Sequence, residues 1–482
     1  MAERRCSGHG PIRQEARVQS ILDRLEQDKD AALERLIALL KIPSISTDPA
    51  YHDRCLQAAQ WLCADLAGMG FSAEVMPTTG KPMVVADYRP KSGGPQLLFY
   101  GHYDVQPADP LDLWDSPPFQ PQLREITPER RQIVARGAGD DKGQLMTFIE
   151  ACRAWFAETG GLPVGVTILL EGEEESGSAS LEPFLDAHAN RLKADIALVC
   201  DTTMWDRDTP AITVQLRGLV GEEIIVSAAD RDLHSGMYGN AARNPNHVLG
   251  RIIADLFDDQ GRIQIPGFYD DVVAPDAAIV QQWRSLIPDD RALLRAVGLE
   301  QPAGEAGLSV LEQVWARPSA EVNGLIGGYT GEGFKTVIPA EARAKISFRL
   351  VRAQDPAAVR AAFRDFVRAR IPADCSVTFR EHGASPALAV DMTNPFVGLA
   401  QQELEAVFGT PAVLLGGGGS IPVVGAFKRK LGMDTLLAGF GLDDDRIHSP
   451  NEKYDLSSFE RGARFWARLL QAAANQASVK KA

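Results

Sequence analysis

Short apolar runs alternate with helical stretches along the first half of the chain, and this alternation most strongly limits the possible folds. Five runs have the length and composition of single strands: residues 83–88, 96–101, 132–137, 164–172 and 194–201. Two segments between them, 144–158 and 179–192, carry apolar side chains at helical spacing. Strands that alternate with helices predict an α/β fold, in which a sheet is flanked by helices.

The pattern changes near residue 211, and this change indicates a second domain. Residues 211–229 read as one long amphipathic β stretch, and the α/β character returns only from about residue 390. A chain of 482 residues is also longer than the roughly 250–300 residues at which single cores stop growing. We therefore predict an α+β domain at 212–388, inserted into a domain made of 29–211 and 389–482, behind a loose N-terminal tail at 1–28.

The composition excludes several classes of partner. A net charge of −14 and a pI near 5.2 argue against nucleic acid, because phosphate binding needs a basic face. No stretch approaches the roughly 18 uninterrupted apolar residues of a membrane span, so no membrane partner is expected. The start of the chain has no apolar signal segment, and the six cysteines are scattered without a CxxC pair. The cytoplasm is the expected location.

Acidic residues and histidines gather where the predicted strands end. They are His102 and Asp104, then Asp140 and Asp141, then Glu173 to Glu175, then Asp201, and finally His448, a short loop beyond a late apolar run. In an open α/β sheet, the loops after the carboxyl ends of the strands converge on one crevice. Imidazole and carboxylate groups delivered there predict a metal site that suits zinc, manganese or cobalt better than calcium.

The number of candidate ligands favours two metal ions over one. Two histidines and three or more carboxylates exceed the needs of a single tetrahedral zinc, and paired ions about 3.5–4 Å apart are common in hydrolases. Cations would also explain how three consecutive glutamates, 173–175, can follow a buried strand. Spacing alone does not assign these glutamates. For each residue a structural explanation also exists, since lone histidines are often structural and acidic loops are often solvated.

Two other kinds of site are rejected on spacing. Gly137, Gly139 and Gly143 follow a strand as GxGxxxG, one residue off the dinucleotide-binding fingerprint, and two aspartates stand where a pyrophosphate would lie. A serine nucleophile would need a GxSxG elbow, whereas Ser420 lies in the sequence GGSIP.

Seven motifs, in this order and spacing, resemble a known enzyme family: GHYDVQP, DDKG, EGEEESGS, DLHSGMYG, KTVIP, GGSIPV and HSPNEK. The family is that of the two-zinc metallopeptidases, which includes carnosine dipeptidases, bacterial glutamate carboxypeptidases, succinyl-diaminopimelate desuccinylase and aminoacylases. The resemblance covers about residues 30–470 and is strongest to the carnosine-dipeptidase branch. It implies a mixed-sheet catalytic domain with an inserted lid and dimerisation domain.

The resemblance also implies the ligands of two divalent metal ions. Zn²⁺ is the expected ion, and Mn²⁺ and Co²⁺ are the alternatives. Asp140 would bridge both ions. His102 and Asp201 would complete one site, and Glu175 and His448 the other.

Further roles follow from the same resemblance. Glu174 would be the general base that takes a proton from the bridging water and delivers it to the leaving amine. Asp104 would hydrogen-bond His102 and orient it. The peptide bond between Asp140 and Asp141 would be cis.

The inserted domain would supply substrate contacts. His234 is the candidate donor to the tetrahedral oxyanion, and in relatives it reaches the active site of a partner subunit, which implies a homodimer. Arg349 would bind a substrate carboxylate, with Thr336 and Ser420 as companions. Close relatives often carry Arg-Glu before Gly-Gly-Ser, whereas this chain has glycines at 416–417, which leaves the exact substrate open.

The predicted activity is metal-dependent hydrolysis of the peptide bond in dipeptides or short peptides with a free C-terminal carboxylate. An N-acyl amino acid amidohydrolase is the alternative within the same chemistry. An inactive metal-binding relative is the alternative that is not an enzyme, although every expected ligand and the base are present.

Overall fold

The chain forms two compact units in a computed structural model, which describes residues 11–91, 93–287, 289–419 and 421–479. Unit 1 comprises residues up to Thr213, Val390–Val413 and the chain from Ala426 onward. Unit 2 comprises Val214–Ala389 and Leu414–Gly425. Both units combine sheets with helices, so the chain has the predicted α/β fold with an inserted α+β unit.

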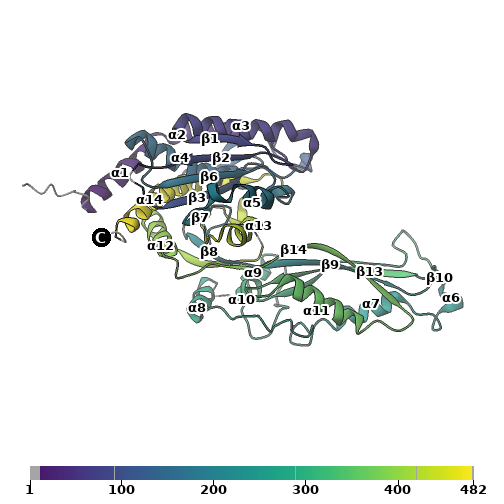
Figure 1. The fold of residues 1–482 in the computed structure, drawn as a ribbon. Coiled ribbons are helices and arrows are strands. Elements are labelled where there is room, and N and C mark those ends of the chain that lie inside the picture. The colour runs from purple at the N-terminus through teal and green to yellow at the C-terminus, as the bar shows by residue number, and fades with distance from the viewer. Residues whose placement is uncertain (1–10, 92, 288, 420, 480–482) are drawn as a thin grey trace, which may run out of the picture. The chain divides into compact units, whose positions relative to one another are not determined.

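Unit 1 is built on a six-stranded mixed sheet (Figure 1). Its order is β1 (Ser72–Met76), β2 (Met83–Tyr88), β6 (Gly165–Glu171), β3 (Gln96–His102), β7 (Ile196–Val199) and β17 (Thr435–Leu437). The strands β6, β3, β7 and β17 run parallel, whereas β1 and β2 pair antiparallel. The central strands β3 and β6 are apolar and almost wholly buried, as expected for strands covered on both faces.

The helices of unit 1 pack on this sheet and on one another. They are α1 (Pro11–Gln27), α2 (Lys29–Leu40), α3 (His52–Met69), α4 (Lys142–Thr159), α5 (Leu181–Leu192), α12 (Pro395–Phe408) and α14 (Leu456–Val479). Phe148 of α4 stacks on Phe99 of β3 with ring centroids 4.0 Å apart, and Trp466 of α14 meets Phe99 edge-on. This aromatic core fixes the start of α4 beside the end of β3. None of the described helices is both long and apolar enough to cross a membrane.

Two expectations for unit 1 are wrong in detail. Residues 11–27 were expected as part of a loose tail but form α1, which packs on α4 and α14 and buries Ile21 and Leu22. The apolar run at 132–137 was expected as a strand of the α/β pattern. Its strand, β5 (Arg130–Val134), belongs to a separate antiparallel sheet between β18 (Lys453–Asp455) and β4 (Gln122–Thr127).

Unit 2 is built on a four-stranded antiparallel sheet in the order β11 (Ser319–Gly327), β13 (Glu341–Leu350), β9 (Gly218–Ser227) and β14 (Ser376–Ser385). Helices α7 (Pro245–Ala254) and α11 (Pro356–Arg368) pack on it and bury one face of β13, where buried and less buried residues alternate. The predicted single strand at 211–229 is instead two strands, β8 (Ala211–Leu216) and β9, on either side of Arg217.

Smaller elements complete unit 2. A two-stranded ladder joins β10 (Leu233–His234) to β12 (Val337–Ile338), and a three-stranded sheet has the order β15 (Leu388–Ala389), β8, β16 (Val413–Gly417). The remaining helices are α6 (Ser235–Tyr238), α8 (Ala277–Leu286), α9 (Ala292–Arg295), α10 (Val310–Ala316) and α13 (Pro422–Ala426).

Candidate metal centre

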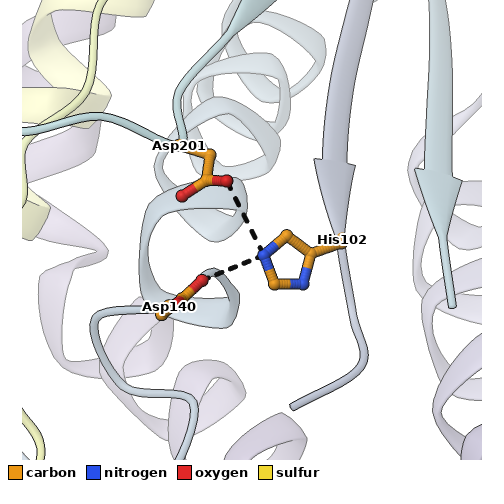
Figure 2. A group of neighbouring side chains, drawn as sticks. All are labelled: His102, Asp140 and Asp201. Carbon is orange, nitrogen blue, oxygen red and sulfur yellow. Dashed lines mark hydrogen bonds and ion pairs between the residues drawn. The ribbon is translucent and has the colours of Figure 1, made fainter. Parts of the chain in front are cut away.

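His102 lies at the carboxyl end of β3, and its ring is fixed on one side by Asp104. The Nδ1 atom is 3.1 Å from the carbonyl oxygen of Asp104 and 3.4 Å from its Oδ1 atom. The Nε2 atom faces two other carboxylates, 2.9 Å from Oδ1 of Asp140 and 3.8 Å from Oδ2 of Asp201 (Figure 2). A proton held at Nδ1 leaves the Nε2 lone pair for a ligand, which is the arrangement found in metal-binding histidines.

Asp140 lies between the two histidines. Its Oδ1 atom faces His102, and its Oδ2 atom is 2.9 Å from Nε2 of His448. The residue ends the loop before α4, and its peptide bond to Asp141 is cis, as the resemblance implied. One carboxylate that offers an oxygen to each side has the geometry of a bridging ligand.

Glu175 completes the second group. Its Oε2 atom is 3.2 Å from Nε2 of His448 and accepts a hydrogen bond of 2.8 Å from the side-chain amide of Gln106. The His448 side chain is about half exposed, and its backbone has a φ of 58°. Within each of the two groups (His102, Asp140 and Asp201; Asp140, Glu175 and His448), the possible ligand atoms all lie within 4.8 Å of one another.

The charges in this cluster call for a cation. Burial, reinforced by the negative charge of Asp140, raises the pKa of Asp201 well above its usual value. Hydrogen bonds to Asp140 and Glu175 raise the pKa of His448 to about 10. A carboxylate and an imidazole that both bind protons more tightly than usual indicate a site with too little positive charge. The nitrogen and oxygen donors therefore fit divalent ions of the zinc type.

The three consecutive glutamates point to different partners. The carboxylate of Glu173 turns away from the centre and accepts a 3.2 Å hydrogen bond from the backbone of Ser180. The backbone N–H groups of Glu174 and Glu175 donate to the carboxylate of Asp104, at 3.3 and 3.0 Å. Asp104 thus holds both His102 and the loop with Glu174 and Glu175. Burial raises the pKa of Glu174.

Glu452 is a site residue that the sequence reasoning missed. It is fully buried, and its carboxylate accepts hydrogen bonds from the backbone N–H groups of Gly137, Gly139 and Asp140, at 2.9, 2.9 and 3.1 Å. It also pairs with the buried guanidinium of Arg136 at 2.7 Å. Glu452 stands in the motif HSPNEK, from which only the histidine was selected. Gln106, in the motif GHYDVQP, was missed in the same way.

Comparison with known proteins decides the family. A family model described as peptidase family M20/M25/M40 matches residues 98–472. The chain belongs to this family.

Named relatives of this M20 chain span most of it. Cys-Gly metallodipeptidase DUG1 of Saccharomyces cerevisiae is 29% identical and covers 94% of this chain and 97% of its own length. Human beta-Ala-His dipeptidase is 28% identical, with 80% of this chain and 76% of its own length covered. The structure of the metallo-carboxypeptidase Sso-CP2 from Sulfolobus solfataricus is 30% identical, has a TM-score of 0.79, and covers 92% of this chain and 99% of its own.

The M20 chain is thus a hydrolase and a metallopeptidase. The predictions of the family, of the fold class and of metal-dependent hydrolysis of dipeptides are confirmed.

The predicted substrate residues lie in unit 2, whereas the metal centre lies in unit 1. His234 is exposed in β10, and its Nδ1 atom accepts a 3.0 Å hydrogen bond from the backbone of Gly236. Thr336 directly precedes β12, and Arg349 lies on the face of β13 opposite the buried core. Ser420 lies outside the described residues.

Proposed function

We propose that this M20 enzyme hydrolyses the peptide bond of dipeptides or short peptides with a free C-terminal carboxylate, by using two divalent metal ions. The observation that carries this proposal is the position of Asp140, which offers one carboxylate oxygen to the group of His102 and the other to the group of His448. Zn²⁺ suits these donors best, and Mn²⁺ and Co²⁺ also suit them.

His102, Asp140 and Asp201 would hold one ion, and Asp140, Glu175 and His448 the other. Bound there, the two ions would polarise the scissile carbonyl and lower the pKa of the attacking water. Asp104 keeps the Nε2 atom of His102 available through its contacts with Nδ1.

Glu174 would be the general base. It directly precedes the proposed ligand Glu175, and among the described residues no group hydrogen-bonds to its carboxylate. Glu174 would accept a proton from the attacking water at its carboxylate and then deliver that proton to the leaving amine.

Residues of unit 2 would bind the rest of the substrate. The imidazole of His234, which is held at Nδ1, would donate from Nε2 to the developing oxyanion. Arg349 would bind the C-terminal carboxylate, with hydroxyl groups of Thr336 and Ser420 beside it.

The substrate class is tested with purified, metal-loaded enzyme. We expect release of free amine from several simple dipeptides, at least about tenfold faster than from the matching N-acetyl amino acids, and loss of this release after treatment with a chelator. Hydrolysis of N-acetyl amino acids alone would show that the enzyme is a deacylase. Tight metal binding without release of amine from any dipeptide would contradict the proposed substrate class.

We also propose a homodimer that pairs through β11. Its second half exposes Leu325 and Ile326, by 63% and 52%. The opposite edge of the same sheet, β14, exposes the charged pair Arg380 and Glu381 instead. Charged side chains discourage pairing at a sheet edge, so β11 is the edge better suited to a second copy.

The dimer prediction concerns Leu325. We expect the wild-type protein to have the mass of a dimer in size-exclusion chromatography with light scattering, and Leu325→Glu to shift it to the monomer. Thr378→Glu, which places the same charge on β14, should remain dimeric. A monomeric wild-type protein would contradict the proposal.

We place the protein in the cytoplasm. In the described part of the chain, Cys55, Cys63, Cys152, Cys200 and Cys375 are all free thiols. Such cysteines persist most readily in a reducing compartment.

A further inference from the structure

Two arginines of unit 2 lie on one face of its main sheet. Arg217 directly precedes β9, and Leu219, two residues later, pairs with Arg349 of β13. Buried and less buried residues alternate without a break from Gln215 to Val220, so Arg217 and Leu219 point to the same side. The two arginines are therefore diagonal neighbours, at a distance that long side chains can span.

This face is the one turned away from the apolar core. Val220 and Phe348, which alternate with these arginines along the strands, belong to the core beneath α7 and α11. The burial of Arg217 and the positive charge of Arg349 lower the pKa of Arg217 to about 10. Because the two guanidinium groups are diagonal neighbours on one face, their positive charges repel each other.

Among the described residues, neither arginine forms a salt bridge that would offset this repulsion. Arg217 donates from its Nε atom to the carbonyl oxygen of Gly418, at 3.1 Å, and from its backbone to that of Gly417. This leaves the two terminal NH₂ groups of Arg217 without an acceptor among the described residues, and Arg349 forms no ion pair there. The negative charge of Glu321 offsets only part of the lowering of the Arg217 pKa, and no salt bridge joins these two described residues.

The surroundings of Arg217 leave room for a ligand. A side chain at Gly418 would begin only 3.4 Å from the Nη2 atom of Arg217. Apart from its chain neighbours, no described residue has an atom within 4 Å of the side-chain position of Gly419. A pocket within unit 2 also reaches Arg217, and it is lined by Arg352, Trp315, Pro275 and Leu388 among others. Its walls combine apolar and polar side chains, and its charged groups are the guanidiniums of Arg217 and Arg352.

We infer that Arg217 joins Arg349 in a two-arginine site that binds the C-terminal carboxylate of the substrate. The assignment to the substrate rests on the proposed peptidase function. A carboxylate would accept hydrogen bonds from the two terminal NH₂ groups of Arg217. It would also relieve the repulsion between the two cations.

Steady-state kinetics of Arg217→Gln test this site. We expect the KM for a dipeptide to rise about 10- to 100-fold, because a charge-assisted hydrogen bond is lost. The kcat should stay within about threefold, since Arg217 would not touch the reacting atoms. Lys345→Gln, which removes an exposed charge from the same face of β13, should leave both constants unchanged. An unchanged KM, or a fall in kcat alone, would overturn the inference.

A second variant covers the case in which Arg217→Gln fails to fold. Arg217→Lys keeps the charge but loses the planar fork, so its KM should rise about three- to tenfold. Circular dichroism establishes folding for each variant. If the folded Arg217→Lys enzyme had the wild-type KM, the planar guanidinium of Arg217 would not be needed to bind the substrate carboxylate.

Binding to metal-free, full-length protein separates this inference from the proposed function. In ligand-observed NMR titrations, propionate should bind Arg217→Gln at least about tenfold more weakly than wild type, whereas neutral propionamide should show no difference. This comparison of affinities does not depend on catalysis. If the wild-type enzyme cleaved no dipeptide, that result would refute the proposed function but would leave the two-arginine site untouched. Equal propionate affinities would refute the two-arginine site. Propionate should inhibit competitively with the dipeptide, and non-competitive inhibition would overturn the assignment to the substrate.

Discussion

Glu174→Gln should lower kcat about 10²- to 10⁴-fold, the usual contribution of a general acid or base. Glutamine keeps the size of the side chain but cannot accept the proton of the attacking water. Because Glu174 is not among the proposed ligands, the variant should bind as much metal as the wild type. Steady-state hydrolysis of a dipeptide, together with metal analysis by mass spectrometry, measures both quantities.

Glu173→Gln is the matched control for this prediction. Glu173 is the adjacent residue, and its carboxylate contacts the backbone of Ser180 outside the metal centre. Its replacement should therefore leave kcat within about threefold of wild type. If Glu174→Gln retained near-full activity, the base would be another group, and if it lost metal, Glu174 would be a ligand.

Most of the metal centre could be predicted because its residues stand at the ends of apolar runs. His102 ends β3 and Asp201 follows β7, two adjacent parallel strands of the main sheet. The convergence of parallel strand ends is a general property of α/β sheets, so the sequence pattern sufficed to bring these residues together. Asp140 follows a strand of a different sheet, and its position could not be derived in this way.

The position of Asp140 depends on contacts between distant segments. The loop before α4 is held by Glu452, more than 300 residues later in the chain. A buried carboxylate that accepts hydrogen bonds from backbone N–H groups produces no periodic pattern in a sequence. The family resemblance included both segments, in the motifs DDKG and HSPNEK, but assigned no role to this glutamate.

The N-terminal helix was missed for a related reason. The segment that forms α1 is rich in charged and polar residues, which suggested a tail. Two of its apolar residues, Ile21 and Leu22, are buried because α4 and α14 offer a surface for them. Helices of this kind gain most of their stability from packing, which local composition does not reveal.

Glu452→Ala should destabilise the protein by at least about 3 kcal/mol, because it leaves the guanidinium of Arg136 buried without its partner. The N–H groups of Gly137, Gly139 and Asp140 would also lose their acceptor, at a further cost. Urea unfolding of the metal-free protein measures this loss.

The same change should weaken metal binding beyond its effect on folding. The loop that Glu452 holds carries Asp140, and loss of groups that orient a metal ligand commonly lowers affinity about 10- to 100-fold. Metal titration of the folded variant against a competing chelator measures the change. Glu150→Ala is the control, since it breaks another ion pair of a buried carboxylate, with the partly exposed Arg35 at 2.6 Å, in the middle of α4. It should lower stability without changing metal affinity.

A double variant, Arg136→Met with Glu452→Leu, separates the ion pair from the loop. Replacing a buried ion pair by apolar side chains often restores stability, so its free energy of unfolding should recover at least half of the loss. Metal affinity should stay low, because leucine accepts no hydrogen bond from Gly139 or Asp140. Recovery of both quantities would mean that Glu452 serves only to neutralise Arg136, and that the backbone contacts do not position the bridging aspartate.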